Sequence, residues 1–207
     1  VPVLFAPEVA RGLISHFVAA VRGSALYREA SFLLGKRYEK IFNECVTIEE
    51  MPHEPGALGS AAFDAEGVAT RNRTLVDAGV LKGYVLSSYS ARKLGEQTTG
   101  NAGGVHNLTV KPGELDFEQM LKRLDRGILV TKTMGQGVNI VTGDYSRGVA
   151  GFWVEDGELV YPVEEITAAG NLKDMFRGIQ AVGKDTDLRG NIRTGSILID
   201  WMTVAGE

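Results

Sequence analysis

The sequence predicts an α+β fold in which helices pack against largely antiparallel sheets. The clearest support is the Asp156-Gly157 pair, which stands between two extended apolar runs within residues 148–165. These two residues tolerate the positive φ angles of a tight type I′ hairpin turn. Residues 41–110 add short apolar runs interrupted by turn-forming residues, which is typical of a strand meander. We expect residues 1–207 to form one domain.

Several segments carry apolar residues at the spacing of an amphipathic helix. Pro7 favours the first turn of a helix that ends near Gly23, and Ser24 can cap a second helix that ends at Gly35. Asp116 and Gln119 have the spacing of a capping box. We therefore expect helices at residues 7–23, 24–35, 87–94, 116–127 and 171–179.

Between the helices, the pattern predicts strands at residues 45–48, 71–76, 80–86, 108–110, 128–133, 138–142, 148–165 and 196–204. In the second arm of the hairpin, Leu159, Tyr161 and Val163 recur with a period of two, so we expect one face of this arm to pack inward. The closing strand is apolar on both faces, Trp201 included, which predicts an internal position in a sheet.

Composition excludes several classes of protein. Apolar residues make up 44% and charged residues 23% of the chain, which is ordinary for a folded, water-soluble protein, and no apolar run approaches membrane-spanning length. A net charge of −4 argues against direct, nonspecific binding to nucleic acid, because such binding depends on clustered Lys and Arg. The single cysteine excludes an intrachain disulfide and favours a reducing compartment, so we expect a cytoplasmic protein.

The chain offers no recognisable catalytic residue or metal site. Its three histidines, His16, His53 and His106, are far apart in sequence and lack the paired spacing of a metal-binding helix. The turn near residue 50 could draw Cys45, His53 and Glu54 together, but a buried thiol and a loop histidine are the simpler interpretation. No Gly-x-Ser-x-Gly motif is present. We therefore expect no catalytic residue, and no metal or cofactor bound by this chain.

A glycine-rich stretch before residue 108 is the strongest candidate for contact with a substrate or partner. Consecutive small residues let a second backbone approach closely and leave N–H groups free to pair with an extended peptide. The alternative is a plain connector between two elements. The candidate contact residues are Gly100, Asn101, Ala102, Gly103, Gly104 and His106.

Three blocks of sequence resemble the TldD/PmbA family, in particular its PmbA (TldE) branch. They are GVLKGYVLSSYSARKLGEQTTGNAGG, TMGQGVNIVTGDYSRGVAGFWVEDGELVYPVEEITAAGNLKDMFRGI and GSILIDWMTVAGE, which together extend from about Val80 to the end of the chain. The resemblance implies the C-terminal domain of the TldD/PmbA fold, in a family whose whole proteins are about twice this length.

The resemblance also implies a function. TldD and TldE pair as a cytoplasmic heterodimer that degrades or matures peptides, including a peptide toxin and an antitoxin, and PmbA has a link to DNA gyrase. In TldD a His-Glu-x-x-x-His helix and a cysteine in a Cys-Gly-Lys-acidic run hold a divalent metal, zinc or iron. The matching run here begins with Val182, which cannot bind a metal. The resemblance therefore implies the non-metal-binding partner, with the metal in a TldD-like subunit.

Other readings stay open at this stage. The chain could form a homodimer, or it could be a nonenzymatic protein that modulates DNA gyrase or a gyrase-directed peptide by contact. A self-sufficient hydrolase would require metal ligands outside these 207 residues.

Overall fold

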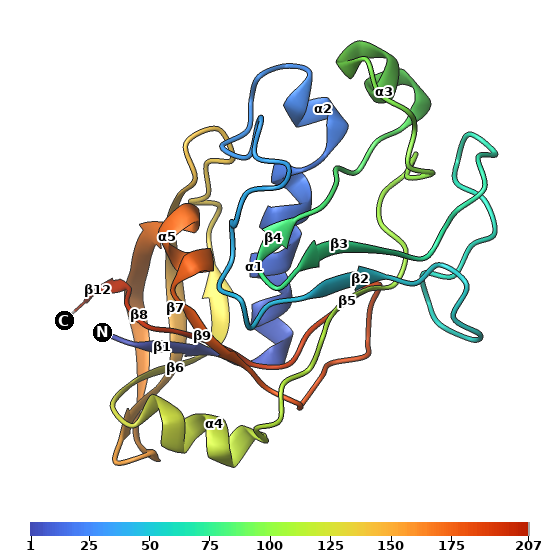
Figure 1. Ribbon diagram of the computed structural model, residues 1–207. Coiled ribbons are helices and arrows are strands. Elements are labelled where there is room, and N and C mark those ends of the chain that lie inside the picture. Colours follow the sequence, from blue (N-terminus) through green and yellow to red (C-terminus); the bar gives the residue numbers. More distant parts are fainter. Residues whose placement is uncertain (207) are drawn as a thin grey trace.

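The computed structural model describes residues 1–206 and shows helices arranged around two sheets (Figure 1). One sheet has seven strands in the order β12-β8-β7-β6-β1-β11-β9. Its strands are β1 (Val3–Phe5), β6 (Gly127–Met134), β7 (Asp144–Glu155), β8 (Glu158–Asn171), β9 (Ile179–Val182), β11 (Ile197–Ile199) and β12 (Thr203–Ala205).

The second sheet has five strands in the order β10-β5-β2-β3-β4. They are β2 (Ile48–Glu50), β3 (Arg73–Asp77), β4 (Val80–Leu81), β5 (Leu108–Val110) and β10 (Ile192–Arg193). Within residues 1–206, β1–β6 and β10–β5 are the parallel strand pairs, and the other pairs are antiparallel. The expected α+β architecture with largely antiparallel sheets is confirmed.

The helices are α1 (Pro7–Ala20), α2 (Gly23–Leu26), α3 (Ser88–Leu94), α4 (Phe117–Leu124) and α5 (Leu172–Arg177). Helix α1 contacts strands of both sheets, and its Leu13, Ile14 and Phe17 are buried in the main core. A smaller core lies under α4, where Met120, Leu121 and Leu124 face the other side of the seven-stranded sheet (Figure 1). In the part of the chain that the structure describes, no helix has both the length and the apolar character that a bilayer crossing requires.

The cap expected at Asp116 is confirmed, whereas the cap expected at Ser24 is wrong, because Ser24 lies inside α2 and the N-cap of that helix is Arg22. Asp116 caps α4 in a reciprocal capping box with Gln119, and Ser87 caps α3 in the same way with Ser90. The expected helix at residues 24–35 is wrong, because α2 ends at Leu26. Glu29 adopts a left-handed φ of 56° and Ala30 donates its N–H to the oxygen of Ala25, which closes the helix after one turn.

The central hairpin has the expected tight turn, with φ angles of 54° at Asp156 and 75° at Gly157. The expected packing of its second arm is wrong for Leu159 and Tyr161, which, like Val160, are about half exposed, whereas Val163 is partly buried against the main core. Strand β12 pairs with the outer edge of β8 only from Thr167 to Ala169, so residues 159–161 lie on a part of β8 whose outer edge is unpaired among the described strands.

The end of the chain also differs from the sequence expectation. Strand β11 lies between β1 and β9 with all three residues buried, as an internal strand should. The chain then turns at Asp200, leaves Trp201 68% exposed and adds β12 at the opposite edge of the sheet. Trp201 is therefore outside the core, and the single closing strand is two strands.

Residues 138–142 form a turn rather than the expected strand. Gly143 donates its N–H to the oxygen of Asn139, and the Asn139 side chain accepts the N–H of Val141. Asparagine competes in this way with sheet pairing because its side chain satisfies nearby backbone groups. Strands β1, β9 and β10 were not expected from the sequence, since each is too short to show a clear period.

Candidate functional site

The glycine-rich loop at residues 100–104 has a backbone that requires glycine. Gly100, Gly103 and Gly104 have φ angles of 71°, 99° and 136°, all in the region that L-residues with side chains rarely adopt. A Cβ atom on Gly100 would lie 2.8 Å from the carbonyl oxygen of Ala69, whereas Gly103 and Gly104 have more room. The first glycine therefore fits the loop against the body of the protein, and the later two form its open part.

A buried carboxylate anchors this loop to the five-stranded sheet. Glu50, at the end of β2, is 1% exposed and accepts hydrogen bonds of 2.7 Å from Arg73 Nε, Asn101 Nδ2 and the backbone N–H of His106. Arg73 also donates from Nη2 to Asn101 Oδ1 at 2.9 Å. A buried charge is tolerated only when it is paired and hydrogen-bonded, and both conditions hold here. The loop is thus fixed at Asn101 before any ligand binds.

A second carboxylate holds the outer side of the loop. Asp64 accepts the backbone N–H groups of Ala102, Glu66 and Val68 at 2.8, 2.9 and 3.0 Å. Burial by itself would raise the pKa of Asp64, but these backbone donors stabilise the charged form and lower the pKa below its usual value. The Asp64–Val68 turn and the glycine loop therefore form one hydrogen-bonded unit.

An open cavity of about 220 Å³ lies beside the loop. Its wall includes Asn101, Ala102 and Gly103 on one side and the aromatic rings of Tyr27 and Tyr89 on another. The two tyrosine rings meet edge to face at 5.7 Å. Such a hollow, with backbone, aromatic and polar groups in its wall, can receive a side chain of a bound peptide.

The histidines do not form a site together. His53 makes a hydrogen bond of 3.0 Å with Thr70, and His16 stacks edge to face with Tyr145 on a different side of the core. The Nε2 atom of His106 is buried without a hydrogen-bond partner among the described residues. Within residues 1–206, no group of three or more His, Cys, Asp and Glu residues is placed to hold a metal ion.

The structure separates the other candidate ligands of the sequence pattern. Cys45 is exposed rather than buried, because it lies in the turn that precedes β2, and its Sγ points to the carbonyl oxygen of Ile179. His53 instead contacts Thr70, so the two residues take part in different contacts. The simpler interpretation of His53 as a loop residue agrees with the structure, whereas the expected burial of the thiol was wrong.

Val182 is an apolar core residue at the end of β9 and is 4% exposed. The turn after it places Asp185 Oδ1 at 2.9 Å from the backbone N–H of Ser196 and at 3.0 Å from the Ser196 hydroxyl. The acidic residue of this run is therefore engaged in closing the turn. The Val182 side chain has no atom that can bind a metal, and one oxygen of Asp185 is already hydrogen-bonded to Ser196, so these two residues do not form a metal ligand set.

Sequence reasoning missed Glu50, Asp64 and Arg73, on which the loop depends. Arg73 stands with Arg71 in a short polar run, and its guanidinium binds a buried carboxylate. One signal was present: Glu50 ends a strand whose first residue, Ile48, is fully buried, and a charged residue on that face of a short strand requires a partner.

Comparison with known proteins identifies the family. Residues 1–206 match the PmbA/TldA metallopeptidase C-terminal domain, and the chain belongs to this family. The metalloprotease PmbA of Escherichia coli O157:H7 is 53% identical over 206 residues, a match that covers 100% of this chain and 46% of the relative. The chain thus spans about half the length of the curated relatives it matches.

Solved structures show the same relationship. A Bacteroides thetaiotaomicron protein described as a modulator of DNA gyrase has a TM-score of 0.95 at 34% identity, over 100% of this chain and 47% of the other. TldE from Thermococcus kodakarensis has a TM-score of 0.88 at 30% identity, over 100% of this chain and 50% of the other. The chain is therefore similar to the PmbA (TldE) branch in both sequence and fold.

Proposed function

We propose that this chain is part of the non-metal-binding subunit of a cytoplasmic TldD/TldE-type metallopeptidase complex, which degrades or matures peptides. The observation that carries the proposal is Val182, a buried aliphatic residue at the position where the resemblance puts a cysteine ligand in the catalytic paralogue. The similarity to TldE and to PmbA supports the same assignment. The divalent metal, zinc or iron, then belongs to a TldD-like subunit, and this chain contributes structure and contact surface.

The exposed part of β8 is the surface that we assign to the TldD-like subunit. Leu159, Val160 and Tyr161 are each about half exposed and form an apolar patch that extends over both faces of the sheet edge, because neighbouring side chains of a strand point to opposite faces. Pro162 has no N–H to donate, so a partner strand could not build a regular ladder along this edge. Contact through side chains is therefore the expected mode, and large exposed apolar patches are typical of such interfaces.

The peptide contact is assigned to residues 100–104 and His106. The loop is held in place by Glu50 and Asp64, so it presents Gly103 and the adjoining cavity without a cost of ordering on binding. The absence of a side chain at Gly103 and Gly104 lets an extended backbone approach. In this assignment the loop positions the substrate, and the chemical step takes place at the metal of the other subunit.

The test is reconstitution of the full-length protein with a TldD-like subunit. Co-purification of the two, peptide cleavage by the pair, and loss of cleavage on chelation are the expected results. Cleavage by the TldD-like subunit alone at the rate of the pair would contradict the subunit role.

A second candidate is a nonenzymatic protein that modulates DNA gyrase or a gyrase-directed peptide by contact. Its support is that two solved relatives, at TM-scores of 0.95 and 0.91, are described as modulators of DNA gyrase. Binding of gyrase in the absence of any TldD-like subunit, without peptide cleavage by the pair, would favour this candidate.

A further inference from the structure

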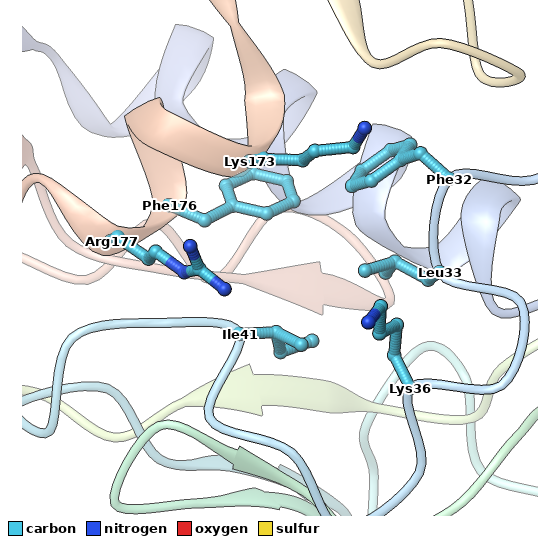
Figure 2. A pocket seen from close by; sticks show the side chains of 7 residues that line it. All are labelled: Phe32, Leu33, Lys36, Ile41, Lys173, Phe176 and Arg177. Carbon is cyan, nitrogen blue, oxygen red and sulfur yellow. The ribbon is translucent and has the colours of Figure 1, made fainter.

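A cavity of about 260 Å³ lies between α5 and the segment that leads from Phe32 to Ile41 (Figure 2). It is separate from the glycine-rich loop and from Val182, none of whose residues line it. Its wall divides into an apolar part, formed by Phe32, Leu33, Ile41 and Phe176, and a cationic part, formed by Lys36, Lys173 and Arg177. Figure 2 shows the three cationic side chains spaced around the opening.

The apolar part belongs to a fixed aromatic cluster. Phe176 stacks on Phe42 with ring centroids 4.4 Å apart, and Phe32 lies 6.2 Å from Phe176. Phe42 in turn meets Phe17 of α1 edge to face at 5.2 Å. The wall is therefore part of the core and keeps its shape without a ligand.

The segment that carries Phe32 and Leu33 is also held in place. Ser31 donates its hydroxyl to the carbonyl oxygen of Ala20 and accepts the N–H of Leu33. Phe32 donates its N–H to the carbonyl oxygen of Ile140 at 3.0 Å. The segment is thus tied to α1 and to the turn at Ile140, and the two segments that form the cavity wall come from ordered parts of the fold.

The cationic part has three cations and one acid paired with them. Among residues 1–206, no acidic residue lines the cavity itself. Lys36 pairs with Glu39 at 3.0 Å, in a pair that is about half exposed. Lys173 and Arg177, four residues apart on α5, form no ion pair within residues 1–206. The opening therefore favours an anion above an apolar wall.

We infer that this cavity binds the C-terminal residue of a peptide that ends in a large apolar side chain. The α-carboxylate lies between Lys173 and Arg177, and the apolar side chain lies on Phe32 and Phe176. A guanidinium and an ammonium are the usual partners of a carboxylate, and aromatic walls take apolar side chains. The volume suits one residue, because it is just below the ~300 Å³ at which sites for drug-sized ligands begin.

The choice of a peptide over another amphipathic carboxylate rests on the proposed function. The site itself goes beyond that function, since it recognises a chain end at a place distinct from the glycine-rich loop. It gives the complex a preference for peptides with a free, apolar C-terminus.

Fluorescence anisotropy on the full-length protein tests the inference without any catalytic step. The probe is an N-terminally labelled hexapeptide that ends in phenylalanine as the free acid. Two companion peptides carry the C-terminal amide or a C-terminal serine. We expect the amide and the serine peptide each to bind roughly tenfold more weakly or worse, because each loses one of the two contacts.

The matched variants separate the site from general charge effects. Lys173→Gln with Arg177→Gln should weaken binding of the free acid to the level of the amide and leave amide binding unchanged. Lys111→Gln with Lys132→Gln also removes two positive charges, but at exposed positions outside the cavity, and this variant should bind the peptide as the parent does. Thermal melts of both variants should match the parent, because all four side chains are exposed.

Equal binding of the acid and the amide would overturn the inference, as would equal losses in the two double variants. Dodecanoate, a carboxylate with an apolar chain, is tested as an alternative ligand. If its binding depends on Lys173 and Arg177 and no peptide binds, the ligand is not a peptide and the inference fails. If the labelled peptide does not bind but the assembled pair still cleaves peptides, this inference fails and the proposed function stands. If the labelled peptide binds as expected but the pair cleaves no peptide, the proposed function fails and this inference stands.

Discussion

Arg73 on β3 donates from Nε to the buried carboxylate of Glu50 on β2, at 2.7 Å. The Glu50 side chain is 2% exposed and that of Arg73 is 19% exposed, so the pair lies at the boundary of the core. The same carboxylate also receives Asn101 and the backbone of His106. One ion pair between neighbouring strands therefore fixes a loop that lies 51 residues further along the chain than Glu50.

Glu50→Ala should reduce the free energy of unfolding by about 3 kcal/mol or more, because it leaves Arg73 and the Asn101 amide without their buried acceptor. Chemical denaturation measures the change. Glu49→Ala, next to it on the same strand but without an ion pair to any residue in the range 1–206, is the matched control and should cost less than about 1 kcal/mol. Equal losses in the two variants would show that the Glu50 network contributes nothing particular.

Gly103→Val with Gly104→Val should weaken assembly with the TldD-like subunit or peptide cleavage by the pair. Both positions have positive φ, so each change also strains the backbone by about 1–3 kcal/mol. Gly35→Val with Gly56→Val imposes similar strain at two open positions with φ of +73°. Co-purification and cleavage assays should be impaired only in the first double variant. If both variants fold, pair and support cleavage as the parent does, the loop is only a connector.

The lowered pKa of Asp64 gives the protein a defined sensitivity to acid. Stability from a carboxylate with a lowered pKa is fully present above its unfolded-state pKa, about 3.9, and is lost as the pH falls through the folded-state value. The parent should therefore exceed Asp64→Asn in free energy of unfolding at pH 6, and the difference should shrink below about pH 4. Denaturation curves at several pH values measure it. A difference that stays constant down to pH 2 would mean that the charge of Asp64 is not what stabilises the loop.

Leu159→Ser with Val160→Ser should prevent pairing with the TldD-like subunit while leaving the fold intact. Both side chains are about half exposed, so the change in stability should stay below about 1 kcal/mol. Light scattering after size-exclusion chromatography of the mixed subunits measures pairing. Leu58→Ser with Leu188→Ser removes two exposed leucines elsewhere and should pair normally. Normal pairing by the β8 variant would exclude this patch from the interface.

Local chemistry made much of the fold predictable. The Asp156-Gly157 turn and the Asp116 cap depend on residues within a few positions of one another, and both formed as expected. The errors came from longer-range effects. The helix expected from Ser24 ended early, at the left-handed Glu29, and Ser31 then bonds to the distant backbone of Ala20. Strands β1 and β9 are defined by pairing with strands far away in the sequence, β1 with β6 and β11 and β9 with β11.

The candidate site was predictable only in part. The small residues of the loop were visible in the sequence, but the residues that hold it were not. Glu50 meets Asn101 across 51 positions and Asp64 meets Ala102 across 38, so no sequence spacing indicates either contact. The exposure of Tyr161 could not be predicted either. A period of two separates the two faces of a strand, but it does not show whether another element packs on either face.

The central claim is that the metal belongs to the other subunit, and metal analysis of the full-length protein tests it most directly. The two subunits are purified separately and then as a pair, alongside Val182→Ala, which should lose about 1–3 kcal/mol of packing stability. We predict zinc or iron at one equivalent in the TldD-like subunit and in the pair, none bound stoichiometrically to this protein alone, and no change in the pair that carries Val182→Ala. One equivalent of metal in this protein alone, together with cleavage of peptides without the partner, would contradict the claim.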